Sequence, residues 1–202
     1  LTVPGLTRDT PLRIEAATAA QTAVDRDPSK ADGLPTIAHY VKKVFLVSDN
    51  DAFNRLYEFL GQREINEGLW SRGFTDARIL RRLEAALDPE ENRLTNPFVF
   101  FQGASVLYRQ PPARNPEVLT NEGRPGVRQG KGFLRDGKLV EQPFDFSHSS
   151  YLSVPDLQGI LRRVLFPEAV SGGERFRLTE DDYRFLYTYM SMLPRESTEP
   201  AY

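Results

Sequence analysis

Residues 47–56 read VSDNDAFNRL, a polar corner that leads directly into an amphipathic helical pattern. Asp49 and Asn50 are residue types favoured at a helix N-cap, because their short side-chain oxygens accept hydrogen bonds from free N–H groups of the first turn. Ser48 and Asn50 lie two residues apart, so a hydroxyl and a carboxamide could face the same space. By itself, a Ser-Asp-Asn triplet indicates only a helix cap.

Three short helices are predicted around this corner. Apolar residues recur at helical spacing over residues 36–45, 50–60 and 62–71, the first with Thr36 as its N-cap. Gly61 and Gly73 stand where left-handed residues would end the second and third helices. We therefore predict a helical core on both sides of the corner.

The composition is that of a soluble globular protein: 202 residues, 40% hydrophobic, with a net charge of −2. The length fits one domain, or one lobe of a larger enzyme. The chain has no excess of positive charge that would indicate nucleic-acid binding, and no apolar run reaches the roughly 20 residues of a membrane span. Because the chain begins at Leu1 without a signal segment, we expect either a removed leader or a piece of a longer protein.

Cysteine is absent, which excludes disulfides, thiolate metal sites and a cysteine nucleophile within these residues. Only two histidines, His39 and His148, are present, so neither a histidine-rich metal site nor a histidine relay is expected. We predict no metal and no cofactor.

The other segments differ in character. Residues 1–35 are expected to be an irregular lead-in, although the alanine-rich part of residues 12–24 permits a short helix. The loop over residues 74–97 could contain some helix at 81–87, and its Pro and Asn content favours an irregular loop held by polar contacts and arginine–carboxylate pairs. Helices are predicted again at 153–166 and 179–193, with Ser153 and Thr179 as N-caps.

Between these parts, residues 98–146 break the helical pattern. The apolar run that starts at Phe98 predicts one β-hairpin, and Asp136-Gly137 is a strong turn signal for a second. We interpret residues 98–152 as a hairpin insertion between the helices and loop of 36–97 and the C-terminal helices of 153–202.

The spaced motif Ser48-Asp49-Asn50-x-Ala52-x-Asn54-x-Leu56 resembles the Ser-Asp-Asn motif of class A β-lactamases and the wider family of penicillin-recognising serine hydrolases. The resemblance covers residues 34–97 and 153–193. Three further stretches match the Ω-loop region of that family. Gly73 and Arg78-Ile79-Leu80-Arg81 resemble the run into the loop, and Arg93-Leu94-Thr95-Asn96-Pro97 resembles the segment that closes it. Between them, Glu84-x-x-Leu87-Asp88 resembles the Glu-x-x-Leu-Asn of the loop, with Asp88 in place of Asn.

In that family an activated serine attacks an acyl group, and water then frees the acylated serine. By resemblance, Ser48 would shuttle a proton toward the leaving nitrogen, and Asn50 would hold a substrate amide. Glu84 would activate the deacylating water. An ionised Asp88 only accepts hydrogen bonds and would repel Glu84, so a salt-bridged surface carboxylate is the alternative interpretation of Glu84.

Two motifs of the family are missing, because residues 1–202 contain neither Ser-x-x-Lys nor Lys-Thr-Gly. We therefore predict a mainly α chain: the helical lobe of a β-lactamase-like fold, with a pair of β-hairpins inserted at about 98–146. We expect the chain to be a fragment of a serine hydrolase that acts on a small-molecule or peptide acyl substrate. The whole enzyme would be exported to the periplasm or the cell surface. The fragment alone would be inactive. The alternative is a non-catalytic module that binds a partner through the hairpin insertion.

Overall fold

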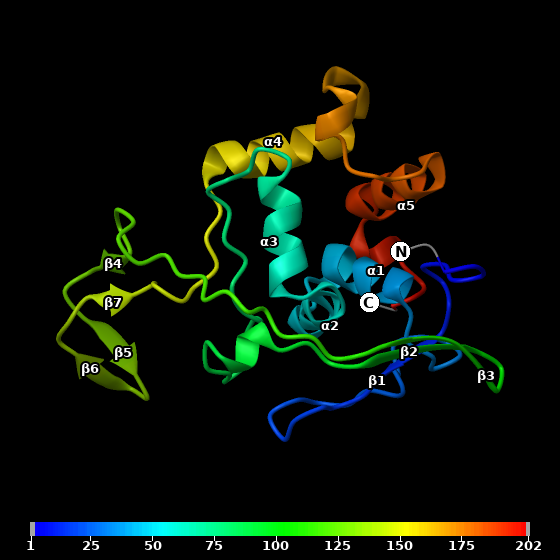
Figure 1. Cartoon of the computed structure of the whole chain (residues 1–202), viewed down its shortest axis with the longest axis horizontal. Coiled ribbons are helices and arrows are strands. Elements are labelled where there is room, and N and C mark those ends of the chain that lie inside the picture. Colours follow the sequence, from blue (N-terminus) through cyan, green and yellow to red (C-terminus); the bar gives the residue numbers. More distant parts are fainter. Residues whose placement is uncertain (1–2, 201–202) are drawn as a thin grey trace.

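The computed structural model describes residues 3–200, in which five α-helices are combined with small antiparallel sheets (Figure 1). The expectation of a mainly α chain is wrong, because the described part has a mixed α/β structure. Strands that are distant in the sequence pair with one another, which local sequence patterns do not reveal. Within residues 3–200 no helix is long and apolar enough to cross a membrane.

The three helices predicted around the corner are confirmed. The Thr36 hydroxyl accepts a hydrogen bond from the His39 N–H at 3.0 Å, and the Asp49 carboxylate accepts one from the Ala52 N–H at 2.8 Å. Gly61 has φ of +83°, and a Cβ there would lie 2.9 Å from the Thr95 side chain, so this position requires glycine. The helices are α1 (Ile37–Val47), α2 (Asn50–Leu60) and α3 (Gln62–Trp70).

A three-stranded antiparallel sheet lies beside α1 and α2 (Figure 1). Its strands are β1 (Leu12–Ile14), β2 (Phe98–Gln102) and β3 (Ser105–Gln110), with β2 in the middle. The permitted helix over residues 12–24 is therefore wrong where β1 forms, since this segment pairs with β2 and its alternate residues Leu12 and Ile14 are buried in the core.

The hydrophobic core is built between this sheet and α1 and α2. Its buried members are Leu12, Ile14, Tyr40, Ala52, Phe98 and Phe100. Strand β2 thus supplies two core phenylalanines, and the first predicted hairpin, β2–β3, belongs to the core rather than to a peripheral insertion.

The second predicted hairpin is confirmed. Strands β5 (Phe133–Arg135) and β6 (Lys138–Val140) are joined by Asp136-Gly137, whose φ angles of 50° and 75° fit a tight hairpin turn. A short pair, β4 (Arg128–Gln129) with β7 (Phe144–Asp145), joins this hairpin to the rest of the chain. Figure 1 shows these four strands at one end of the molecule, away from the helices.

The two C-terminal helices are also confirmed as α4 (Val154–Leu165) and α5 (Glu180–Ser191), with the predicted caps Ser153 and Thr179. The apolar residues Leu157, Leu161 and Leu165 of α4 are nevertheless exposed, although their helical spacing predicts burial. Spacing identifies the face of a helix, but not whether another element covers it. Four 3₁₀ turns complete the described chain: Glu91–Arg93, Pro167–Ala169, Gly172–Glu174 and Pro194–Glu196.

Candidate functional site

The Ser48-Asp49-Asn50 corner joins α1 to α2. Ser48 is exposed and has a left-handed conformation, with φ of 53° and ψ of 43°, while its N–H donates to the Lys43 carbonyl. Asn50 is the first residue of α2 and is half-buried. A non-glycine residue at positive φ is strained and persists only where its surroundings hold it, which is typical of functional sites.

Asp49 fixes the corner through both carboxylate oxygens. Oδ1 accepts the Ala52 N–H, and Oδ2 lies 3.0 Å from the Lys43 ammonium. Burial alone would raise the pKa of Asp49, but these two contacts hold it below its ordinary value. Asp49 therefore stays ionised and keeps capping α2.

Glu84 is carried by an irregular loop, residues 78–97, without the helix considered for 81–87. It is exposed and has φ of 51°. Within residues 3–200 it forms no ion pair, so the structure gives no support to a salt-bridged Glu84.

Asn54 joins α2 to the residue before Glu84. Its Oδ1 accepts the Leu83 N–H at 2.7 Å, and its Nδ2 donates to the Leu83 carbonyl at 2.9 Å. The helix that begins at the corner thus holds the backbone next to Glu84. Sequence reasoning assigned Asn54 no role, although its position four residues after Asn50 places both on one face of α2.

A cavity of about 400 Å³ lies where α2 meets this loop. Asp51, Asn54 and Glu84 line it together with Ala20, Gln21, Thr22, Arg55, Glu58, Arg82, Ala85, Ala86 and Leu87. Ser48 and Asn50 are not among the lining residues. Of the predicted site residues, the structure therefore brings Glu84 to the side of α2 and leaves Ser48 and Asn50 at the start of the helix.

Buried ion pairs line the 400 Å³ cavity between α2 and the loop. The Glu58 carboxylate accepts hydrogen bonds from Arg55 at 3.0 Å and from Arg82 at 2.8 Å, and all three residues are buried. Arg82 also donates to the Leu94 carbonyl at 2.8 Å. The predicted arginine–carboxylate pairs of the loop are confirmed, but the partner on α2 could not be identified from the sequence.

Polar side chains also satisfy the backbone of the loop. The Tyr57 hydroxyl is 3.0 Å from the Leu80 carbonyl, which also accepts from the Gln62 carboxamide at 2.9 Å. Asn66 on α3 accepts the Ile79 N–H and donates to the Ile79 carbonyl, at 2.8 Å in both cases. These contacts replace the hydrogen bonds that secondary structure would otherwise supply.

Asp88 has a local function. Its carboxylate accepts the Glu91 N–H at 2.7 Å, and the Glu91 carboxylate accepts the Asp88 N–H at 2.8 Å. This reciprocal pair fixes the backbone that leads into the 3₁₀ turn Glu91–Arg93. The aspartate that replaces the asparagine of the resembled motif therefore has a local structural contact, for which an acceptor is sufficient.

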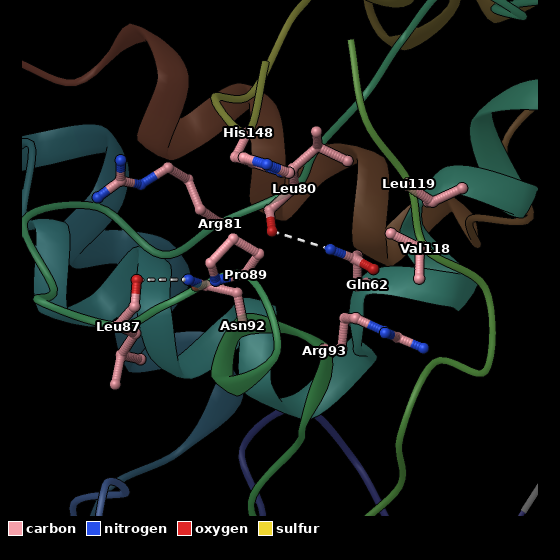
Figure 2. Close-up of a pocket in the computed structure, with 10 residues that line it drawn as sticks. All are labelled: Gln62, Leu80, Arg81, Leu87, Pro89, Asn92, Arg93, Val118, Leu119 and His148. Atoms are coloured by element: carbon pink, nitrogen blue, oxygen red, sulfur yellow. Dashed lines mark hydrogen bonds between the residues drawn. The ribbon is translucent and has the colours of Figure 1, made fainter. Parts of the chain in front are cut away.

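A second cavity, of about 230 Å³, lies between the loop and residues 118–119 (Figure 2). Figure 2 shows Leu80, Val118 and His148 around it, with the hydrogen bond from Gln62 to Leu80 at its edge. Its lining contains neither Glu84 nor any residue of the corner. Within residues 3–200 no group of three or more His, Cys, Asp or Glu side chains is suited to hold a metal ion.

Comparison with known proteins assigns the family. A family model described as the beta-lactamase enzyme family matches residues 5–111. The chain belongs to this family. In this β-lactamase family member, the matched part contains the corner, α2, the Glu84 loop and the β1–β2–β3 sheet, and it ends before the second hairpin and α4. No curated protein and no solved structure gives a significant match.

Replacing Asn54 by alanine should free the Leu83 backbone from α2. Because Leu83 is exposed, water can replace the two lost hydrogen bonds, and we expect the free energy of unfolding to fall by only about 0.5–1.5 kcal/mol. Hydrogen exchange at the Leu83 amide should become much faster. Glu64→Ala, on the exposed surface of α3, is the control. Unchanged exchange at Leu83 would show that Asn54 does not hold the loop.

Proposed function

We propose that this chain is part of a serine hydrolase that works by acyl transfer, with the nucleophilic serine outside residues 1–202. Membership of the beta-lactamase family supports this assignment. The observation that carries it is the paired hydrogen bonding of Asn54 with Leu83, because it joins the loop of Glu84 to the helix that begins at Ser48-Asp49-Asn50.

The proposed reaction has two steps. The serine oxygen attacks the carbonyl carbon of the substrate and the bond to the leaving nitrogen breaks. The proton lost by the attacking serine reaches that nitrogen through the Ser48 hydroxyl, which takes up one proton and gives another. The carboxamide of Asn50 holds a substrate amide during this step. Water then attacks the acyl-serine while the Glu84 carboxylate takes its proton and passes it to the departing serine oxygen, which releases the acid and restores both groups.

The substrate class that fits this proposal is an acyl compound, either a small molecule or a peptide. Export to the periplasm or the cell surface is the localisation that goes with it. The rival hypothesis is a non-catalytic module that binds a partner through the second hairpin, where Leu134 and Leu139 are exposed.

Intact-mass spectrometry with a fluorescent penicillin tests the proposal. The 202-residue chain should gain no mass and should not hydrolyse nitrocefin, because it lacks the nucleophile. The full-length protein should either gain the mass of one penicillin or hydrolyse nitrocefin, depending on how fast it deacylates. An adduct on the 202-residue chain would overturn its predicted inactivity. A full-length protein that neither forms an adduct with penicillin or an activated peptide ester nor hydrolyses nitrocefin or the ester would overturn the serine hydrolase and favour the binding module.

A further inference from the structure

A partly buried ion-pair cluster reaches the corner from the preceding segment of the chain. The Lys43 ammonium lies 3.0 Å from Oδ2 of Asp49 and 3.1 Å from Oδ2 of Asp27. The side chains of Lys43 and Asp27 are only 12% and 7% exposed. The ammonium is therefore enclosed between two carboxylates, and solvent screens the pairs much less than it screens surface pairs.

Lys43 also contacts the corner through its backbone. Its carbonyl oxygen accepts the N–H of Ser48, and the N–H of Asp49 approaches the same oxygen at 3.4 Å. One residue of α1 thus holds the strained Ser48 backbone at one end and the Asp49 carboxylate at the other. Asp49 in turn caps α2.

Asp27 is itself fixed. Its Oδ1 accepts hydrogen bonds from the Ser29 hydroxyl at 2.6 Å and the Ser29 N–H at 3.0 Å, and the same hydroxyl lies 2.9 Å from Nε2 of His39. His39 is 1% exposed, and burial lowers its pKa. These three residues are not a catalytic triad, because the carboxylate contacts the serine rather than the far side of the imidazole.

We propose that Lys43 is a positioning residue of the acyl-transfer site: together with Asp27 it fixes Asp49 and, through Asp49, the places of Ser48 and Asn50. This inference rests on the proposed function. Burial alone would lower the pKa of Lys43, but the two carboxylates raise it. Lys43 therefore stays protonated, and it acts as a fixed cation rather than as a base.

The kinetic test uses Lys43→Met in the full-length protein, which removes the charge and keeps an unbranched side chain one atom shorter. The rate constant for acylation by a fluorescent penicillin should fall about tenfold or more. Without the Lys43 charge, Ser48 and Asn50 would be displaced, so that proton transfer and substrate positioning become less efficient. The deacylation rate should change less than about twofold, since Asn54 holds the Glu84 loop independently of Lys43. If Lys43→Met acted only by destabilising the fold, acylation and deacylation would both become slower.

Lys42→Met is the matched control. Lys42 is the preceding residue of α1, and its ammonium lies over the ring of Tyr189. Both rate constants should stay at their wild-type values in this variant. Unchanged acylation in Lys43→Met, or an equal loss in both steps, would overturn the assignment.

A second measurement separates this inference from the proposed function. In the full-length protein, NMR titration of the Asp49 carboxyl should show its pKa rising toward the ordinary value in Lys43→Met and unchanged in Lys42→Met. If the wild-type protein neither forms an adduct nor hydrolyses an acyl substrate, the proposed function fails, and the role of Lys43 in holding Asp49 is still decided by this titration. An unchanged Asp49 pKa overturns it.

Should Lys43→Met not fold, Asp27→Asn takes its place. This variant leaves Lys43 paired with Asp49 and removes one of the two charges that hold the ammonium. Acylation should then slow by roughly threefold while deacylation is unchanged. A folded Asp27→Asn protein with wild-type acylation would contradict the proposal.

Discussion

Phe98→Ala should lower the free energy of unfolding by about 3–5 kcal/mol, the usual cost of removing a buried phenylalanine ring. Phe98 is 0% exposed, and its ring centroid lies 5.3 Å from that of Phe59 on α2. The substitution would leave a cavity between the sheet and α2. Urea denaturation followed by circular dichroism measures the loss.

The control for this substitution is Val106→Ala on the neighbouring strand β3. Val106 is 52% exposed, so its truncation should change the free energy of unfolding by less than about 0.5 kcal/mol. If Phe98→Ala were as mild as Val106→Ala, strand β2 would be peripheral, as the insertion hypothesis held, and its placement in the core would be wrong.

Arg82→Met should cost about 3–5 kcal/mol of the free energy of unfolding, because removing one partner leaves a buried charge without full compensation. Glu58 would keep only its contact with Arg55, and the Leu94 carbonyl would lose its donor. The loop that carries Glu84 should loosen at the same time. Urea denaturation and hydrogen exchange of residues 80–94 measure the two effects.

Two further variants test that explanation. Arg63→Met removes a cation from an exposed pair with Glu67 on α3 and should have little effect, as is usual for surface ion pairs. Adding Glu58→Gln to Arg82→Met should lower the stability further, because the buried Arg55 would keep only the exposed Asp51 as its carboxylate partner. If Arg82→Met were as mild as Arg63→Met, the buried pair would not contribute to holding the loop.

Features that depend on neighbouring residues were predictable from the sequence. The N-caps at Thr36, Asp49 and Ser153 need only a suitable side chain within three residues of the N–H that it accepts. The Asp136-Gly137 turn is equally local. Strand β1 could not be predicted in this way, because it forms by pairing with β2, far along the chain.

The candidate site shows the same division. The motif placed Ser48 and Asn50 at the start of α2, and the resemblance selected Glu84. The contact of Lys43 with Asp27 and the contact of Arg82 with Glu58 could not be predicted, because pairs of charged side chains from separate segments have no periodic signal in the sequence. Only the fold brings these partners within hydrogen-bonding distance.

The irregular loop over residues 78–97 takes its conformation from neighbouring helices. Tyr57 and Gln62 hold the Leu80 carbonyl, and Asn66 holds both backbone groups of Ile79. Backbone groups carry no side-chain identity, so these contacts would accept many residues at the loop positions themselves. A loop of different sequence could therefore be grafted here for redesign, provided that these helix side chains are retained together with the loop's own Arg82, which pairs with the buried Glu58.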